Sequence, residues 1–276
     1  MRKLLLCAAL CGLCLGNSLN VIKETKTIRI GVRIAQAPYS VLENGEFHGF
    51  EVDLAKAVGK KIVGDDGTIE LVGVNAADRI PFLKDNKADL MLANFSITPE
   101  RANQVDFGSA YLSNVEAVVS QKSAAIRKVN DLSAVRVAVI PDTTSEEWLK
   151  EKAAGMDLTM IHCENTKNCL EKMQNGEAQA YVHTNILIAT LPLVDQSLEM
   201  SMPNVGNYTF IAPAVAKGNK ELLEAVNHAI LDLSEDGFFQ KAYDDDLEPF
   251  YKGTLDRKYL LLDDLYNSMM TMDEEQ

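Results

Sequence analysis

The sequence predicts an α/β fold with two units of similar size, each built on a largely parallel sheet that helices cover on both faces. Strand-like runs alternate with helix-like runs along the chain, which is typical of such a sheet. A second series of the same kind begins at Asp131-Leu132 and predicts a second unit. The length of 276 residues, 47% of them hydrophobic and 24% charged, suits two modest folded domains.

The first series opens with a β-rich run at 27–34, followed by a helix whose apolar residues recur at helical spacing. These apolar residues are Phe50, Leu54, Ala57, Val58 and Ile62. A strand, a helix, a strand and another helix are then expected at 69–74, 79–87, 88–94 and from Pro99 onward.

The second series repeats this order. It predicts strands at 135–140, 158–162 and 178–183, with helices at 146–153 and 168–175 between them. A β-rich segment at 207–215 and an amphipathic helix at 220–233 follow. We expect the acidic residues 255–276 to form a C-terminal extension with no assignable chemistry.

The N-terminus has the pattern of a secretory signal peptide, which we place at 1–18. A charged start at Arg2 and Lys3 precedes an apolar run at 4–15, which is shorter than the roughly 20 residues of a membrane span. Cys7, Cys11 and Cys14 lie within this run, and the leucines before the last two fit a lipoprotein signal badly. Soluble export is therefore favoured over lipid anchoring.

Cysteines and charge limit the compartment and the partners. Cys163 and Cys169 remain after export, and an oxidising compartment would allow a short disulfide, although two separate thiols fit equally well. The net charge is −13, or −15 once Arg2 and Lys3 leave with the signal. Nucleic acid and anionic membranes are excluded as partners on this basis, and an anionic ligand must be attracted by local groups.

One helix start has the pattern of an anion site. Thr98 suits the N-cap and Pro99 the first helical position, while Ser96 precedes them and Arg101 lies in the first turn. Free backbone N–H groups and a guanidinium can together bind a carboxylate. Spacing alone supports equally a capped helix with its arginine in solvent.

A second helix start follows Pro141, where Thr144 and Glu147 stand at capping-box spacing next to Thr143. If both helix starts face one cleft, a single carboxylate can bridge the two units, although an ordinary helix cap is the better reading of this segment alone. Aromatic residues near these segments could contact the body of a ligand, but single aromatics are more often core. They are Tyr39, Phe50 and Phe95.

Motifs spread over nearly the whole exported chain then resemble the periplasmic amino-acid-binding proteins of ABC importers, the polar amino-acid family of solute-binding proteins. The motifs are Ile30-Gly31-Val32, Ala37-Pro38-Tyr39-Ser40, Gly49-Phe50-Glu51-Val52-Asp53-Leu54-Ala55, Ser96-Ile97-Thr98-Pro99-Glu100-Arg101 and Val105-Asp106-Phe107. A closer likeness is to the subgroup that binds cysteine or acidic amino acids. It is carried by residues 75–81, 92–95, 211–215 and 238–243.

The resemblance implies a two-lobed periplasmic-binding-protein fold, each lobe a mostly parallel sheet flanked by helices, with a two-strand hinge. We expect the crossing strands near 116–119 and 210–214. Lobe 1 is then discontinuous, and the boundaries follow: 24–116 plus 214–254 for lobe 1 and 117–213 for lobe 2.

The resemblance also implies roles for individual residues. Arg101 would hold the ligand carboxylate, assisted by Ser96 and the backbone at Asn94. Arg79 stands where relatives place an arginine that contacts the ligand side chain. Further ligand contacts are implied at Tyr39, Phe50, Phe95, Thr143, Thr144 and Thr184.

Two departures from the family pattern bear on the ligand. Thr184 stands where the family usually has an aspartate that pairs with the ligand α-ammonium, and Asp142 replaces a glycine. A buried ammonium without a counter-charge costs several kcal/mol. Either Asp142 or Glu164 supplies the counter-charge, or the ligand is not a free α-amino acid.

The family resemblance predicts a periplasmic, monomeric receptor that closes on a small carboxylate-bearing ligand, such as an amino acid, and delivers it to an ABC permease in the inner membrane. No catalytic residue, metal or cofactor is expected, since the four histidines lack ligand spacing. The alternative is a cyclohexadienyl dehydratase-like enzyme, whose acid would be Glu164, Asp142 or His183. A sensor domain is the least favoured reading.

Overall fold

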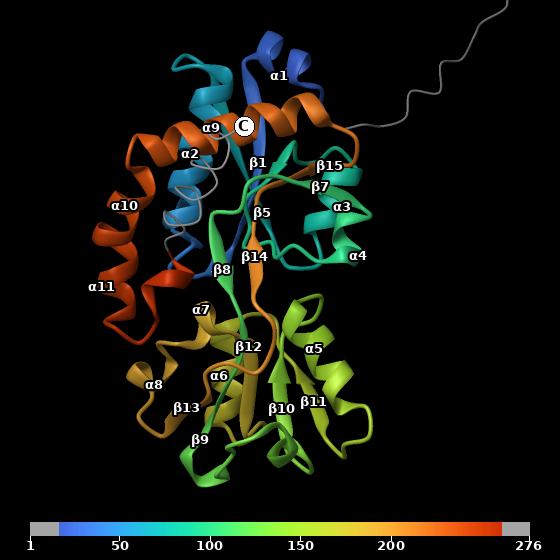
Figure 1. Cartoon of the computed structure of the whole chain (residues 1–276), viewed down its shortest axis with the longest axis vertical. Coiled ribbons are helices and arrows are strands. Elements are labelled where there is room, and N and C mark those ends of the chain that lie inside the picture. The colour runs from blue at the N-terminus through green and yellow to red at the C-terminus, as the bar shows by residue number, and fades with distance from the viewer. Residues whose placement is uncertain (1–16, 261–276) are drawn as a thin grey trace, which may run out of the picture.

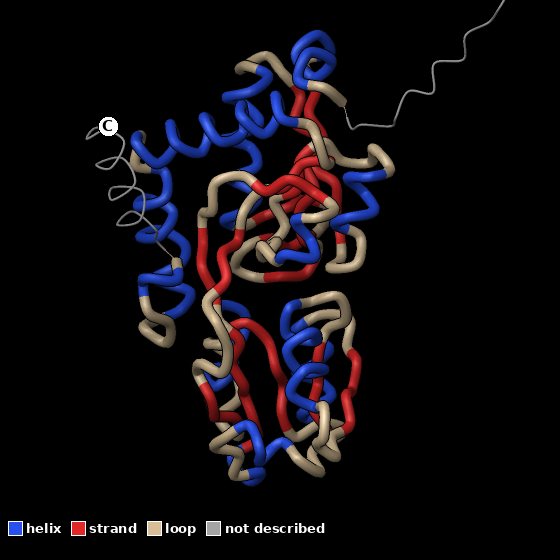
Figure 2. The backbone as a smooth tube through the Cα atoms, turned by 45° about the vertical axis from the view of Figure 1, so that its right-hand side comes forward, coloured by secondary structure: helices blue, strands red, loops and turns tan. Residues whose placement is uncertain are grey.

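The computed structural model describes residues 17–260 as two lobes, one above the other, joined by a narrow connection (Figures 1 and 2). Most of the predicted signal peptide and residues 261–276 of the predicted extension lie outside the described residues. Within 17–260, none of the helices has the length and apolar character needed to cross a membrane.

The upper lobe in Figure 1 is built on a five-stranded sheet in the order β5-β1-β6-β15-β7. Its strands are β1 (Thr27–Arg33), β5 (Thr68–Val74), β6 (Leu90–Met91), β7 (Val105–Phe107) and β15 (Ala214–Ala216). The strand β1 pairs in parallel with β5 and β6, and β15 adds antiparallel to β6 and β7. The return of the chain at β15 therefore completes the sheet that β1 begins.

Helices and a small sheet surround this upper sheet. The helices are α1 (Leu19–Thr25), α2 (Phe50–Val63), α3 (Arg79–Lys84), α4 (Pro99–Ala102), α9 (Lys220–Glu235), α10 (Phe238–Ala242) and α11 (Glu248–Tyr251), with a π-helical turn at Tyr243–Leu247. The small antiparallel sheet contains β2 (Ala35–Gln36), β3 (Ser40–Glu43) and β4 (Glu46–His48). The apolar face predicted for α2 is buried against the core.

The lower lobe contains a second five-stranded sheet in the order β11-β10-β12-β9-β13. Its strands are β9 (Glu116–Gln121), β10 (Arg136–Val139), β11 (Thr159–His162), β12 (Ala180–Thr184) and β13 (Leu198–Met202). Its helices are α5 (Thr144–Ala153), α6 (Thr166–Gln174), α7 (Asn185–Ile188) and α8 (Leu191–Val194), and short 3-10 turns lie at Lys122–Ala124, Val129–Leu132 and, in the upper lobe, Arg257–Tyr259. Strand β10 pairs in parallel with β11 and β12, while β9 and β13 are antiparallel.

Two antiparallel strands cross between the lobes: β8 (Leu112–Asn114) and β14 (Thr209–Ile211). This corrects the first expected crossing, at 116–119, because Glu116 already pairs with Thr184 in the lower sheet. Residues 112–121 form an almost continuous buried β-run, so the sequence does not mark where the crossing strand ends and β9 begins.

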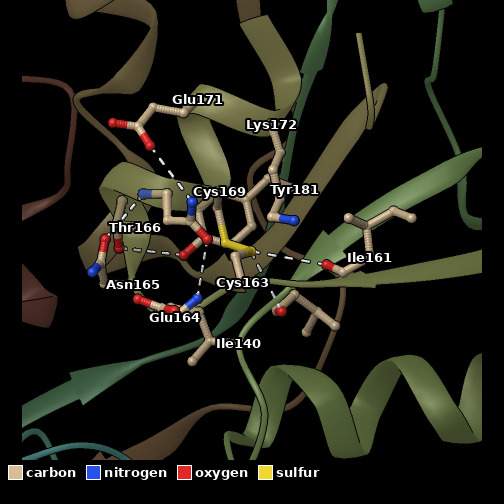
Figure 3. Close-up of a disulfide and its surroundings, with 12 residues drawn as sticks. Ile140, Ile161, Cys163, Glu164, Asn165, Thr166, Cys169, Glu171, Lys172 and Tyr181 are labelled. Atoms are coloured by element: carbon tan, nitrogen blue, oxygen red, sulfur yellow. Dashed lines mark hydrogen bonds between the residues drawn. A yellow bond between two sulfur atoms is a disulfide. The ribbon is translucent and has the colours of Figure 1, made fainter. Parts of the chain in front are cut away.

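Cys163 and Cys169 are joined in a disulfide, with their Cα atoms 5.3 Å apart (Figure 3). Cys163 follows β11 directly, and Cys169 lies in α6. The bond therefore attaches the end of an edge strand to the helix beside it.

Candidate functional site

Arg101 lies in the first turn of α4, with only 6% of the residue exposed. Thr98 caps this helix, because its hydroxyl oxygen accepts a hydrogen bond from the Arg101 backbone N–H at 3.2 Å. The guanidinium donates to the Ser96 carbonyl at 3.1 Å and forms an ion pair at 3.3 Å with Glu147 of the lower lobe. The expected cap is present, but α4 is a single turn, so the positive charge comes chiefly from the guanidinium.

Arg79 begins α3 and is equally buried. Its guanidinium donates to the carbonyl oxygens of Ala76 at 3.0 Å and Asn94 at 2.9 Å. A third hydrogen bond, at 3.0 Å, reaches the carbonyl of Asp142 in the lower lobe, and Arg101 donates to that same oxygen at 3.3 Å. One carbonyl of the lower lobe therefore receives two guanidinium groups of the upper lobe.

The Phe95 ring supports both guanidinium groups. Their central carbons lie 4.6 Å (Arg79) and 5.4 Å (Arg101) from the ring centroid, within the range of a cation–π contact. Burial lowers the pKa of both arginines, and the charge of Arg101 lowers the pKa of Arg79 further. Phe95 therefore acts as a platform for the two cations.

The backbone of Asp142 explains why the family pattern has glycine there. Its φ of +59° lies in the left-handed region, which glycine adopts freely and aspartate tolerates better than most residues. This conformation turns the Asp142 carbonyl to the two arginines. The backbone N–H donates to Glu146 Oε2 at 3.1 Å, within the first turn of α5.

Asn94 also has a left-handed φ, of +49°, and a buried carboxylate holds it. Glu51 Oε1 accepts hydrogen bonds from the Asn94 backbone N–H and from the Tyr111 hydroxyl, both at 2.6 Å. Burial raises the pKa of Glu51 to about 7. Glu51 therefore fixes the backbone whose carbonyl receives Arg79.

Arg33 and His183 complete the charged and titratable lining. Arg33 ends β1 and donates from Nε to Gln36 Oε1 at 2.9 Å, while burial lowers its pKa to about 10. His183 Nδ1 accepts a hydrogen bond from the Thr184 backbone N–H at 2.7 Å, and burial lowers the pKa of His183 to about 3. The imidazole is therefore neutral, and its proton lies on Nε2.

These residues line one small, partly open cavity between the lobes. The lining also includes the start of α5 and the end of β12. The full set is Arg33, Gln36, Ala76, Arg79, Asn94, Ser96, Arg101, Thr143, Thr144, His183 and Thr184.

The structure brings together most of the residues expected at the ligand, but the three aromatic ones do not line this cavity. Tyr39 is fully buried, with its hydroxyl 2.6 Å from that of Tyr251, and Phe50 packs between Tyr39 and Phe239 in the core. Neither residue lines this cavity, and their contact with a ligand stays a prediction. Phe95 lies behind the arginines and outside the cavity lining.

Asp142 and Glu164 do not line this cavity. Both border a neighbouring pocket that also includes Cys163 and His162. Asp142 also borders the pocket that contains Arg79, Arg101 and Phe95, and its role or that of Glu164 as the counter-charge stays a prediction.

Arg33 and Gln36 are two polar lining residues that the sequence did not predict. A usable signal was present, because Arg33 is a charged residue at the carboxyl end of a buried parallel strand, where ligands of open α/β sheets bind. Gln36 carried no comparable signal, since its place depends on the turn that follows β1.

Residues 28–245 match the family model for bacterial extracellular solute-binding proteins, family 3. Among curated relatives, the glutamine-binding protein of a Bacillus subtilis ABC transporter is 24% identical, over 82% of this chain and 83% of its own length. The L-cystine-binding protein of Escherichia coli K12 is 27% identical, over 80% and 83% of the two chains.

Two solved structures are similar over nearly their whole length. The solute receptor for L-cysteine of Neisseria gonorrhoeae is 32% identical, with a TM-score of 0.83, and the match covers 89% of this chain and 99% of that one. The cysteine-binding protein of Campylobacter jejuni is 31% identical with the same TM-score, over 88% and 98% of the two chains.

Proposed function

Because the chain belongs to the bacterial extracellular solute-binding proteins of family 3, we propose that it is the solute receptor of an ABC importer and binds a small carboxylate-bearing solute between its lobes. The named relatives bind glutamine, cystine or cysteine, so amino acids are the first solutes to test. The receptor would work in the periplasm as a monomer and present its closed form to a membrane permease.

The observation that carries this proposal is the meeting of the two lobes on buried arginines. Arg79 and Arg101 belong to the upper lobe, and their shared partner, the Asp142 carbonyl, belongs to the lower one. A ligand carboxylate is a stronger acceptor than a backbone carbonyl and can take a bidentate pair from a guanidinium. Bound there, it would stabilise the closed arrangement of the lobes.

We assign the other contacts by position. Ser96 and the Asn94 backbone would assist Arg101 at the carboxylate, and Thr143 and Thr144 would face it from the start of α5. Thr184 would contact the remainder of the ligand. The lobes proposed for this movement are 24–111 plus 212–254 and 115–208, with β8 and β14 as the hinge, because Glu116 already pairs in the lower sheet.

The dehydratase alternative finds no support in this site. Two of its three candidate acids, Asp142 and Glu164, lie outside the cavity lining, and the third, His183, has a pKa of about 3 and is neutral. The named relatives are transport binding proteins.

A thermal-shift screen tests the receptor function. The chain is titrated with amino acids, cystine, dicarboxylates and amines, and a true ligand at 100 times its Kd should stabilise it by about 2.7 kcal/mol. Arg101→Ala should remove the response. Arg127→Ala, at an exposed arginine paired with Glu199 on the lower lobe, should not. A flat response to every carboxylate would contradict the proposal.

A further inference from the structure

The cavity between the lobes contains three guanidinium groups and no carboxylate among its lining residues. Arg101 has an anionic partner in Glu147, but Arg33 and Arg79 have only amide and carbonyl oxygens as hydrogen-bond acceptors. A buried cation without an anionic partner is costly. The nearby Glu51 offsets part of the charge of Arg33 and Arg79 through space, and excess positive charge remains to be matched by whatever occupies the cavity.

The side-chain atoms at this cavity that lack a hydrogen-bond partner are donors, and they also favour an anionic ligand. Among the described residues, its lining contains three buried side-chain nitrogens without a hydrogen-bond partner: Arg33 Nη1, Asn94 Nδ2 and His183 Nε2. Each residue is more than nine-tenths buried. The first two are donors by their chemistry, and His183 Nε2 is one because its Nδ1 accepts from the Thr184 N–H.

Glu51 and Glu116 are buried carboxylates outside this lining that accept hydrogen bonds from other groups, although Glu51 Oε2 has no hydrogen-bond partner. Glu51 binds the Asn94 N–H and the Tyr111 hydroxyl, and Glu116 accepts from Ser145 at 2.5 Å. An α-ammonium needs acceptors, and the side chains of the lining offer it hydroxyl groups and the amide oxygens of Gln36 and Asn94, but no carboxylate.

We infer that the ligand is a small dicarboxylate without an ammonium group, with one carboxylate at Arg101 and Arg79 and the other at Arg33 and His183. This rests on the proposed receptor function and narrows it. Thr184 then has a direct role, because the aspartate of the family pattern would repel the second carboxylate.

Calorimetric titrations of matched pairs test the inference on the unmodified chain. Succinate is compared with L-aspartate, and glutarate with L-glutamate, so that each pair differs in the ammonium alone. We expect each dicarboxylate to bind at least about 10-fold more tightly than its amino acid, since an uncompensated buried charge costs more than the 1.4 kcal/mol of one decade. Butyrate serves as the monocarboxylate control and should bind more weakly than succinate.

Variants make the test sharper. Arg33→Gln should weaken dicarboxylate binding by about 10-fold or more, whereas Arg127→Gln, at an exposed arginine far along the lower lobe, should not. Thr184→Asp should reverse the preference within each pair, and Thr184→Asn, of the same size without the charge, should not.

The outcomes separate the two claims. Tighter binding of L-aspartate or L-glutamate than of its partner would overturn the dicarboxylate inference and leave the receptor function intact. Equal binding of butyrate and succinate would also overturn it. No binding of any carboxylate or amino acid would contradict the receptor function itself, and the inference with it.

Discussion

At the scale of single residues, the buried arginines are held by dipoles and an aromatic face more than by opposite charges. Arg79 makes three hydrogen bonds, all to backbone carbonyls, and lies over Phe95. Such partners offset part of the desolvation cost and leave the positive charge available to a ligand. The site is therefore organised before ligand arrives, because each guanidinium already has a fixed direction.

The planar guanidinium group of Arg101, which has several N–H donors, gives the first prediction. Arg101→Lys keeps the charge but cannot contact Ser96, Asp142 and a ligand carboxylate together. We expect ligand affinity to fall by about 10-fold to 100-fold in calorimetry, at about 1.4 kcal/mol per decade. Arg127→Lys is the control on the lower lobe, and unchanged affinity in Arg101→Lys would show that charge alone is sufficient.

Glu51 predicts a pH dependence of stability. Its pKa rises from 4.5 to about 7 on folding, so between these values the native state holds a proton that the unfolded chain has released. Its contribution is complete below about pH 4.5 and is lost as the pH rises through 7, a change of about 3 kcal/mol. Urea unfolding of the wild type and of Glu51→Gln at several pH values isolates the contribution of Glu51 to the free energy of unfolding. The two proteins share every other titrating group, including His183. A pH-independent difference would contradict it.

At the scale of elements, a close approach of two segments explains one glycine. The first turn of α2 donates from Phe50 to the Pro38 carbonyl at 3.1 Å and from Glu51 to the Tyr39 carbonyl at 2.8 Å. Gly49 precedes that turn with a φ of +121°, and a Cβ there would lie 2.5 Å from the Pro38 oxygen. Only glycine allows this contact between helix and loop.

Gly49→Ala should therefore destabilise the chain by at least about 1–3 kcal/mol, the usual cost of a strained backbone, with the steric overlap added. Gly45→Ala is a matched control, because Gly45 also has a positive φ, of +86°, but no atom within 4 Å of its Cβ position. Chemical unfolding compares the two. Equal losses would show that φ alone, rather than the contact with Pro38, demands glycine.

The disulfide gives a second element-scale prediction. Cys163 and Cys169 close a loop with a sequence separation of 6, and loop-closure entropy for so short a loop gives roughly 2 kcal/mol. Urea unfolding of the oxidised protein and of Cys163→Ser/Cys169→Ser should differ by about that amount. Addition of a reductant should lower the stability of the wild type alone, and identical curves would show that the bond contributes nothing.

The sequence predicts most elements because their signals are local. Apolar periodicity marks α2 and α9, and short apolar runs mark β1, β5 and β10. The crossing strand was displaced because β8 and β9 follow one another with only Val115 between them. The small sheet β2–β4 was not anticipated, since strands of two to four residues carry too short a pattern.

The site also divides into features that adjacent residues predict and features that depend on distant parts of the chain. The cap at Thr98 and the position of Arg101 were readable from adjacent residues. Arg33, His183 and Arg79 come from three separate elements, and their meeting depends on how the lobes pack. The packing of Phe50 on Phe239 could not be predicted from local residues, because Phe239 lies far along the chain.

At the scale of the whole molecule, the lobes touch on two sides of the hinge. In Figure 1, α11 approaches α7 on one side, and the Tyr251 hydroxyl donates to the Ile186 carbonyl at 2.5 Å. On the other side, α4 faces α5 through the pair of Arg101 and Glu147. The Tyr251 contact is fully buried, whereas the Glu147 side chain is 46% exposed. The pair of Arg101 and Glu147 is therefore the more exposed of these two contacts, and we expect the lobes to open on that side.

Removal of the ion pair tests that expectation. Glu147→Gln should shift the ligand-free receptor toward an open form, because Arg101 then keeps only carbonyl partners. A half-exposed pair of this kind contributes on the order of 1 kcal/mol, so the closed-to-open ratio should fall by about fivefold. Single-molecule fluorescence transfer between labels on the two lobes measures this ratio. Glu151→Gln lies on the same helix but pairs with Lys152 of its own lobe, and it should change nothing. An equal shift in both variants would mean that α5 responds to net charge rather than to its contact with Arg101.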